Sequence, residues 1–238
     1  MRVARVVLWQ RIAETLTAEI KANAFPPGSR MPTEMALAER FGVNRHTVRQ
    51  AIGALSDSGL VSVQHGRGTF VQPAPVIQYP LGPRTRFSEI ISRQSRIADG
   101  ELLASQQQPA EAAIAEALGL APGEPVWVLE ILRRADGLPI SLKTAYLSAA
   151  RFPGLDAIFR ETRSLTEALR RFAIADYARR STRIWTRMPT LEEASLLRQQ
   201  PAEPLLVMET LDEDMQGRPI EFGIARSCGG RVEVLVGS

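Results

Sequence analysis

Residues 33–59, TEMALAERFGVNRHTVRQAIGALSDSG, decide the fold of the first third of this chain. The pattern predicts a short helix that starts after Thr33 and stops at Gly42, because glycine is favoured just beyond a helix C-terminus. Asn44 fits the N-cap position of a following helix, which we expect to reach about Ser58. Two helices separated by so tight a turn are typical of a helix-turn-helix.

The flanking segments complete a larger unit. Upstream, five apolar residues at helical spacing predict a helix that ends before the Phe-Pro-Pro-Gly run at 25–28: Trp9, Ile12, Ala13, Leu16 and Ile20. Downstream, Gly59 ends the last helix, and strands are predicted at Leu60–Gln64 and Thr69–Gln72, joined by the glycine-containing turn His65–Gly68. Helix, helix, turn, helix and hairpin is the order of a winged helix-turn-helix, which we assign to residues 1–72.

The helix after Asn44 has two distinct faces. Its inward stripe is apolar and consists of Val48, Ala51, Ile52 and Leu55. Its opposite face carries Arg45, His46, Arg49 and Gln50. Arg45 and Arg49 lie one turn apart, and an arginine on a helix in the major groove can bind guanine through two hydrogen bonds. The alternative is a solvated helix face, which the winged unit around it disfavours.

The charge distribution also favours DNA as the partner of this unit. Residues 1–72 contain nine Lys or Arg and five Asp or Glu, a net charge of +4, whereas the whole chain carries +3. The rest of the chain is therefore close to −1. A basic excess in the first third is expected of a unit that meets a phosphate backbone.

The bulk composition indicates two soluble globular domains. The chain has 238 residues, of which 45% are hydrophobic and 23% charged. A single cysteine, Cys228, rules out an internal disulfide and fits a reducing cytoplasm. We find no signal peptide and no apolar stretch of transmembrane length, and so expect a cytoplasmic protein without a membrane partner.

The composition changes after Gln72. Several prolines and Gly82 predict an extended linker over residues 73–84. Residues 85–238 predict an α+β domain, with helices at 110–118, 165–172 and 191–198, and strands at 125–135, 138–147, 179–187, 205–215, 218–226 and 231–236.

An internal echo runs through this second part. The segment from Glu124 to Ile140 recurs as Glu203 to Ile220, with a turn at Asp136-Gly137 in one copy and at Gln216-Gly217 in the other. A short helix precedes each copy. Two hairpins of one design suggest a sheet with two similar halves and a cleft between them, although Pro, Gly and Glu also recur by chance.

The sequence argues against catalysis. Both histidines, His46 and His65, lie in the first unit, which excludes a histidine-dependent nucleophile in residues 85–238. Cys228 has no histidine or cysteine neighbour for a metal site. The acidic run Asp212–Asp214 would alternate between strand faces, and we expect a solvated strand edge there. We therefore expect no catalytic residue, no metal and no cofactor.

The first unit resembles the GntR family of bacterial regulators. The resemblance is carried by Pro27–Glu34, Leu37-Ala38, Phe41–Arg45, Thr47–Arg49, Ala51-Ile52, Leu55, Gly59–Val61 and Gly66–Val71. It implies contacts to double-stranded operator DNA from Arg30, Asn44, Arg45, His46, Thr47 and Arg49, and from the wing residues His65, Gly66 and Arg67. Met35 departs from the pattern, since several members place an arginine there, and this changes the expected base preference.

Residues 85–238 resemble the UTRA effector domain of the HutC branch of that family. The matching runs are Leu118–Val126, Arg133, Ala135–Ile140, Phe152–Leu155, Ser164–Thr166 and Gly217–Glu221. The resemblance implies a fold similar to chorismate lyase, in which an antiparallel sheet with helices holds a ligand cavity, and it implies a homodimer. Within the branch, Asn44–Thr47 and Arg84–Ser88 look most like the PhnF-type regulators of phosphonate uptake and breakdown.

Related sensing domains bind phosphorylated effectors, which implies a ligand site here. Its residues would be Thr85, Arg86, Phe87, Ser88, Arg133, Ser164, Thr166 and Glu221. Arginine suits phosphonate or phosphate oxygens, and Glu221 can accept from a ligand amine or hydroxyl. Ile131 and Thr166 stand where some sugar-phosphate sensors have Arg and Tyr, which argues for a smaller or different ligand. Arg134, on the other strand face, is expected to be solvated.

Three hypotheses follow from these resemblances. The first is a ligand-responsive repressor of a phosphonate uptake or breakdown operon. The second is the same type of regulator answering an amino-sugar phosphate or a histidine-breakdown intermediate. The third is a lyase-like enzyme fused to a winged helix, although fold alone does not give function.

Overall fold

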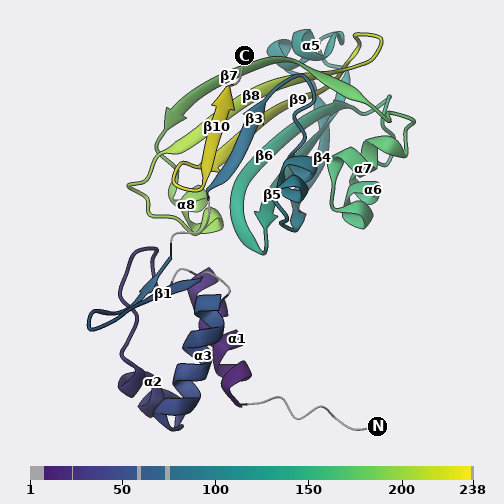
Figure 1. Ribbon diagram of the computed structural model, residues 1–238. Helices are drawn as coiled ribbons and strands as arrows, with labels where there is room; N and C mark the ends of the chain where they lie inside the picture. Colours follow the sequence, from purple (N-terminus) through teal and green to yellow (C-terminus); the bar gives the residue numbers. More distant parts are fainter. Residues whose placement is uncertain (1–7, 23, 58–59, 73–75, 237–238) are drawn as a thin grey trace, which may run out of the picture. The chain divides into compact units, whose positions relative to one another are not determined.

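The computed structural model describes residues 8–22, 24–57, 60–72 and 76–236. It divides the chain into two compact units, Met1–Pro75 and Val76–Ser238. The N-terminal unit contains α1 (Leu8–Lys21), α2 (Glu34–Phe41), α3 (Arg45–Asp57) and the antiparallel hairpin of β1 (Val61–Gln64) and β2 (Gly68–Val71), as Figure 1 shows. This is the predicted winged helix-turn-helix. The helix end predicted at Ser58 and Gly59 lies outside the described residues.

Local capping explains where the two helices of the motif begin and end. The Thr33 hydroxyl accepts a hydrogen bond from the Ala36 N–H, and Gly42 adopts φ 64° to end α2. The Asn44 side chain accepts from the Thr47 N–H at 2.9 Å. Each such cap stabilises its helix by about 1 kcal/mol, and the tight turn between them sets α3 against α2.

The core of the N-terminal unit is continuous across all three helices and the hairpin. Its buried side chains include Ile12, Leu16, Leu37, Val48, Ile52, Leu55, Val61 and Val71. The predicted inward stripe of α3 is therefore buried, which leaves its polar face outside. The hairpin turn relies on Gly66 and Gly68, which have φ values of 74° and 118°.

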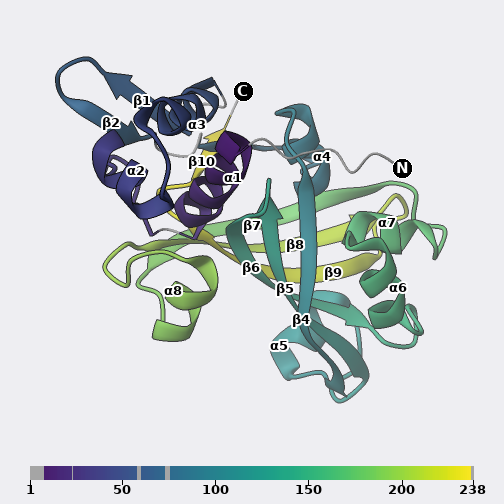
Figure 2. The same ribbon diagram turned by 90° about the horizontal axis from the view of Figure 1, so that it is seen from below.

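The C-terminal unit is built on a six-stranded antiparallel sheet with strand order β4-β5-β6-β9-β8-β7, visible in Figure 2. The strands are β4 (Ala98–Pro109), β5 (Pro125–Ala135), β6 (Leu138–Ser148), β7 (Tyr177–Arg187), β8 (Leu205–Asp214) and β9 (Pro219–Cys228). Its helices are α4 (Phe87–Arg93), α5 (Ala112–Leu118), α6 (Leu155–Thr162), α7 (Leu165–Arg170) and α8 (Leu191–Leu197).

The two faces of the sheet are covered by different helices. Side chains alternate along each strand, so Leu129 and Ile131 of β5 pack with α6 and α7, whereas Val126 and Val128 pack with α5. Leu132 lies on the α5 side as well, in a cluster with Leu197 of α8. None of the helices in the described part of the chain has both the length and the apolar character needed to cross a lipid bilayer.

The sheet is made of two similar halves, as the internal echo suggested. The halves are β4–α5–β5–β6 and β7–α8–β8–β9, and both β4 and α5 begin 79 residues before their counterparts β7 and α8. Strands β6 and β9 pair at the centre, so the halves are related across the middle of the sheet. Even the strand irregularities correspond: the register shifts after Arg133 in β5 and after Asp212 in β8.

The segment predicted as a linker is partly folded. Strand β3 (Ile77–Leu81) pairs in parallel with β10 (Val232–Val236), so most of residues 76–84 belongs to the C-terminal unit rather than to an extended connection over 73–84. The partner strand lies about 150 residues further along the chain, and no local pattern reveals such a pairing. Residues 73–75 of the predicted linker lie outside the described residues.

Candidate functional sites

The start of α3 presents the side chains predicted to contact DNA bases. Arg45 and Arg49 expose 64% and 65% of their side chains, and His46 is exposed as well. Asn44 and Thr47 bond to each other, because the Thr47 N–H and hydroxyl both donate to Asn44 Oδ1. These two residues shape the helix start and leave the arginines and His46 accessible to a ligand.

Glu34 of α2 links the two arginines. Arg49 donates to its carboxylate through Nε at 3.1 Å and Nη2 at 2.9 Å, and Arg45 Nη2 lies 3.6 Å away. The hydrogen bonds from Arg49 hold the pKa of Glu34 below its usual value despite partial burial. Neighbouring Met35, where an arginine was the expected alternative, leaves 68% of its surface exposed.

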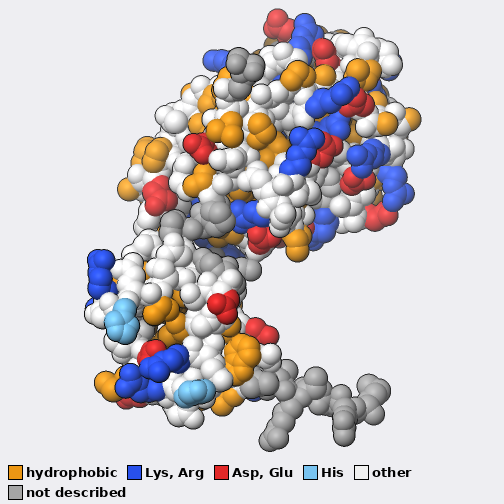
Figure 3. Space-filling view, viewed as in Figure 1, with side chains coloured by type: hydrophobic (Ala, Val, Ile, Leu, Met, Phe, Trp, Pro, Cys, Tyr) orange, Lys and Arg blue, Asp and Glu red, His pale blue; other side chains and the backbone are white. Residues whose placement is uncertain are grey.

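The hairpin carries the second predicted DNA-contact group. His65, Gly66 and Arg67 are exposed at its turn. Arg30 lies across Gly68, where a Cβ atom would approach its Nε to 2.6 Å. Figure 3 shows basic side chains and both histidines on the surface of this unit. The unit thus offers two exposed basic surfaces, one on α3 and one on the wing.

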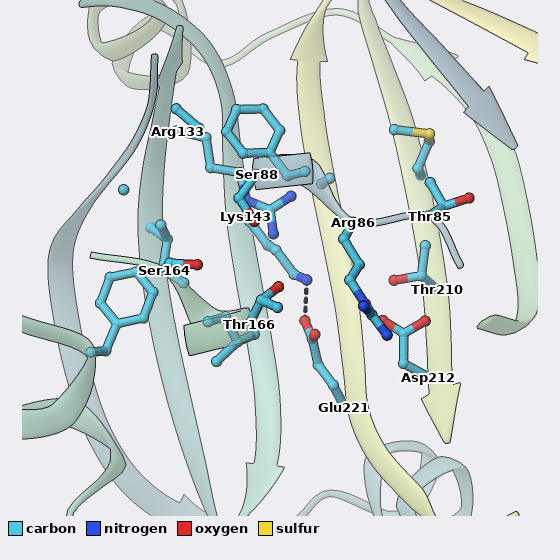
Figure 4. A pocket seen from close by; sticks show the side chains of 18 of the residues that line it. Thr85, Arg86, Ser88, Arg133, Lys143, Ser164, Thr166, Thr210, Asp212 and Glu221 are labelled. Atoms are coloured by element: carbon cyan, nitrogen blue, oxygen red, sulfur yellow. Dashed lines mark ion pairs between the residues drawn. The ribbon is translucent and has the colours of Figure 1, made fainter. Parts of the chain in front are cut away.

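A pocket in the C-terminal unit gathers the predicted ligand residues. The empty space within it is about 750 Å³, which includes open solvent at its mouth. All eight predicted residues line it: Thr85, Arg86, Phe87, Ser88, Arg133, Ser164, Thr166 and Glu221. They come from α4 and the turn before it, from β5, from the start of α7 and from β9, and Figure 4 shows most of them.

Arg86 is buried and already held by protein groups. Its guanidinium pairs with Glu89 and Asp176 and stacks 4.4 Å from the centre of the Tyr177 ring. Arg86 Nε is nevertheless a buried donor for which the described residues provide no acceptor. Thr85 is occupied too: its hydroxyl accepts from the Gly82 N–H and donates to a backbone carbonyl. Its role is to fold the turn before α4.

Arg133 is the least neutralised cation of the pocket. Its guanidinium lies 4.9 Å from the centre of the Phe87 ring, an arrangement in which the ring face attracts the positive charge. In the part of the chain that the structure describes, no carboxylate lies within ion-pairing distance of it. Arg134 points to the other face of β5 and pairs with Glu101 and Asp99, so it is ion-paired rather than simply solvated.

The start of α7 contributes hydroxyl groups. Ser164 caps the helix by accepting a hydrogen bond from the Glu167 N–H. The Thr166 hydroxyl lies 2.9 Å from the Tyr177 hydroxyl, and both side chains are buried. Burial raises the pKa of Tyr177, which keeps that hydroxyl protonated and able to donate.

Lys143 was missed by the sequence analysis. It lies on β6, is buried, and forms an ion pair with Glu221, which Figure 4 marks. Burial lowers the pKa of Lys143 to about 8, Glu221 raises it and the nearby Arg133 lowers it. Gly223 leaves room for the pair, because an added Cβ would lie 2.8 Å from both side chains. One signal was present: Lys143 is one of only two lysines in an arginine-rich chain.

Asp212 and Arg179 form a second buried pair. Arg179 donates to the Asp212 carboxylate through Nε at 2.5 Å and Nη2 at 3.3 Å. Burial and the neighbouring Glu221 raise the pKa of Asp212. The expectation that Asp212–Asp214 form a solvated edge is therefore wrong for Asp212 and Asp214, which are 2% and 4% exposed. A β-bulge and surrounding arginines bury both acids, which strand alternation alone does not predict.

The pocket as a whole is suited to an anion. Five of its lining residues are cationic (Arg86, Arg133, Lys143, Arg163 and Arg179) and three are anionic (Asp99, Asp212 and Glu221). Arg86 Nε and Arg179 Nη1 are buried donors without an acceptor among the described residues. Buried donors cost free energy when unpaired, so a ligand with several oxygen acceptors would be stabilised here.

Comparison with known proteins agrees with this arrangement. The chain matches the family of bacterial regulatory proteins called gntR over residues 8–71 and the UTRA domain over residues 93–233. The probable transcriptional regulator PhnF of Escherichia coli is 33% identical over 94% of this chain and 92% of its own length. The mannosyl-D-glycerate transport/metabolism system repressor MngR of the same organism is 29% identical over 90% of this chain and 89% of its own length.

A solved structure shows the same architecture. The crystal structure of PhnF from Mycobacterium smegmatis has a TM-score of 0.63 and 29% identity, and the match covers 98% of this chain and 99% of that one. The predicted fold class, a winged helix-turn-helix followed by an antiparallel sheet with helices, is confirmed by this similarity.

Proposed function

Because the chain belongs to the GntR family of bacterial transcription regulators and carries a UTRA domain, we propose that it represses an operon for phosphonate uptake or breakdown. The observation that carries the proposal is the pocket's surplus of cations, with Arg133 unpaired by any carboxylate of the described residues. A phosphonate or phosphate ester offers the oxygen acceptors that this surplus suits. In this proposal the protein binds its effector without turning it over, in the cytoplasm.

The proposed DNA contacts follow from the exposed surfaces of the N-terminal unit. Arg45, His46 and Arg49 meet base edges in the major groove, while Arg67 and His65 on the wing meet the adjacent backbone or minor groove. Two copies bind a near-palindromic operator, one recognition helix per half-site, with spacing set by a homodimer.

Effector binding is proposed to release the operator. The pocket is lined by Thr85–Ser88, which lie shortly after β3, and β3 begins close to the boundary between the two units. An effector that binds better to the arrangement unable to span both half-sites shifts the population towards it. The coupling therefore needs a ligand-dependent change in residues 76–88.

Fluorescence anisotropy tests this function. The purified chain is titrated onto the DNA upstream of its own gene, with and without phosphonates, phosphate esters, amino-sugar phosphates and urocanate. Specific binding that only a phosphonate or phosphate ester weakens supports the proposal. If a sugar phosphate or urocanate releases the DNA instead, the protein responds to that signal and not to a phosphonate. If no compound of the panel changes DNA binding, the proposal that the protein senses a phosphorus compound is wrong. Turnover of any panel compound would revive the enzyme hypothesis.

A further inference from the structure

The charged groups that line the pocket and those that pair with them balance one another except at one residue. Four local groups are neutral: Lys143 with Glu221, Arg179 with Asp212, Arg84 and Arg86 with Glu89 and Asp176, and Arg134 and Arg163 with Glu101 and Asp99. Arg133 remains: its guanidinium lies against the Phe87 ring, and no carboxylate of the described residues pairs with it. Arg133 is half-buried and has no carboxylate partner among the described residues, so a ligand with a single net negative charge would balance it.

The two halves of the sheet give the pocket an acidic end as well as a basic one. Arg133 at the bulge of β5 and Asp212 at the bulge of β8 occupy corresponding positions, 79 residues apart, and they carry opposite charges. Asp212 is the register partner of Glu221, and each is only 2% exposed. The acidic end is thus a buried pair of carboxylates on β8 and β9.

Lys143 connects the two ends. In Figure 4 it lies between Arg133 and Glu221, with its ammonium directed at Glu221. Arg133 and Lys143 line the same pocket, so an anion bound at Arg133 also attracts the Lys143 ammonium. If Lys143 moves towards that anion, the negative charge of Glu221, which is buried beside Asp212, loses part of the positive charge that balances it. A ligand whose anionic group binds Lys143 must therefore bring a positive charge to Glu221 and Asp212.

We propose that the effector is a short zwitterion, an aminoalkyl phosphonate whose phosphonate binds Arg133 and Lys143 and whose primary ammonium binds Glu221 and Asp212. This inference rests on the function proposed above and narrows its ligand class. A phosphonate dianion with one ammonium carries the single net negative charge that balances Arg133. A hydroxyl in place of the ammonium could donate a hydrogen bond but would not replace the charge withdrawn from Glu221.

Isothermal titration calorimetry with two isosteric probes tests the proposal on the full chain near neutral pH. The probes are 2-aminoethylphosphonate and n-propylphosphonate, in which a methyl group replaces the ammonium. We expect the amino compound to bind at least about 10-fold more tightly, as a charge-assisted contact at a buried site predicts. Glu221→Gln should reduce that ratio to near one, whereas Glu209→Gln, whose carboxylate pairs with Arg183 outside the pocket, should preserve it.

The comparison in the unmodified chain decides the matter even if Glu221→Gln fails to fold. Equal affinities, or tighter binding of propylphosphonate, would overturn the zwitterion assignment and leave the phosphonate repressor intact. If neither probe binds and no other phosphorus compound does, both the zwitterion and the proposed function fail. An unchanged ratio in Glu221→Gln would show that the ammonium binds elsewhere, and would also reject the assignment.

Discussion

Glu34 at the start of α2 accepts two hydrogen bonds from the guanidinium of Arg49 on α3, at 2.9 and 3.1 Å. The contact fixes a side chain proposed to read DNA, and it does so before DNA is present. An arginine held in one orientation loses less conformational entropy on binding than a mobile one. The same carboxylate lies 3.6 Å from Arg45, so a single acidic residue orders both arginines.

Glu34→Gln should therefore reduce sequence discrimination. The variant frees both arginines and removes one negative charge, which strengthens nonspecific attraction to phosphates. We expect the ratio of operator to scrambled-duplex affinity to fall by about 3- to 10-fold, measured by anisotropy at one fixed salt concentration. A ratio equal to that of the unmodified chain would mean that Glu34 has no part in orienting the arginines.

Arg45→Glu should abolish specific operator binding while leaving effector binding unchanged. It replaces the donor that we propose binds a base edge by a group that phosphates repel, and we expect a loss of at least about 100-fold. Arg11→Glu on the exposed surface of α1 changes the net charge equally and serves as the control. If both variants lose affinity alike, the effect is one of overall charge and not of a base contact.

Arg133→Ala should show the opposite behaviour. DNA binding should persist, and release by the effector should be lost, because the variant removes the one cation of the pocket without a carboxylate partner among the described residues. Arg134→Ala is a matched control on the other face of the same strand. Anisotropy with effector present separates the two, and a normal response of Arg133→Ala would refute the site.

Lys143→Met should destabilise the C-terminal unit because it leaves Glu221 buried without its cation. We expect a loss of about 3 kcal/mol in the free energy of unfolding, largely restored in the double variant Lys143→Met, Glu221→Gln. The pKa of Lys143 is about 8 in the fold against 10.5 ordinarily, so the unfolded chain binds more protons between these values. Stability from this group should rise with pH across that window, and denaturant titration should find no such rise in the double variant.

Glu193→Gln probes the cap of α8. Hydrogen bonds from Arg187 and the Thr190 N–H lower the pKa of Glu193 from 4.5 to about 2. The ionised form therefore contributes stability above pH 4.5, and this contribution disappears as the pH falls towards 2. We expect the free energy of unfolding of the variant to be about 2 kcal/mol lower than that of the unmodified chain at neutral pH, and the two to be equal near the lower end of that pH range. An equal loss at both ends of the range would point to packing instead of charge.

Local patterns in the sequence were enough to predict the winged unit. The caps at Thr33 and Asn44, the glycine at 42 and the inward stripe of α3 are decided by contacts within a few residues, so short-range rules describe them. The two hairpins of the C-terminal unit were predictable for the same reason, since the turn at Asp136-Gly137 needs two residues with positive φ.

Other helices and strands were not predicted, for reasons that differ from element to element. The edge strand β4 is largely polar and α4 has only seven residues, so their patterns are weak. Helix α6 is amphipathic, with Leu155, Ile158 and Phe159 at helical spacing, and the sequence analysis missed it although this pattern was present. Strand β3 depends on its pairing with β10. The eight predicted pocket residues were named through resemblance, and the fold brings them to one pocket. The sequence analysis did not place Lys143, Arg179 and Asp212 in the pocket. Strand alternation predicts on which face of the sheet a side chain lies, but it does not predict which side chain of another strand it will pair with.

The sequence by itself thus determined the order of elements in the N-terminal unit, the polar face of α3 and the surplus of basic charge in residues 1–72, since each depends on neighbours along the chain. Only the tertiary structure decided which charges neutralise one another. Glu221 on β9 meets Lys143 on β6, and Arg179 on β7 meets Asp212 on β8, because sheet register and burial bring together residues separated by 78 and 33 positions. Those pairings leave Arg133 as the pocket cation without a carboxylate partner among the described residues, which is why we propose it as the anion-binding residue.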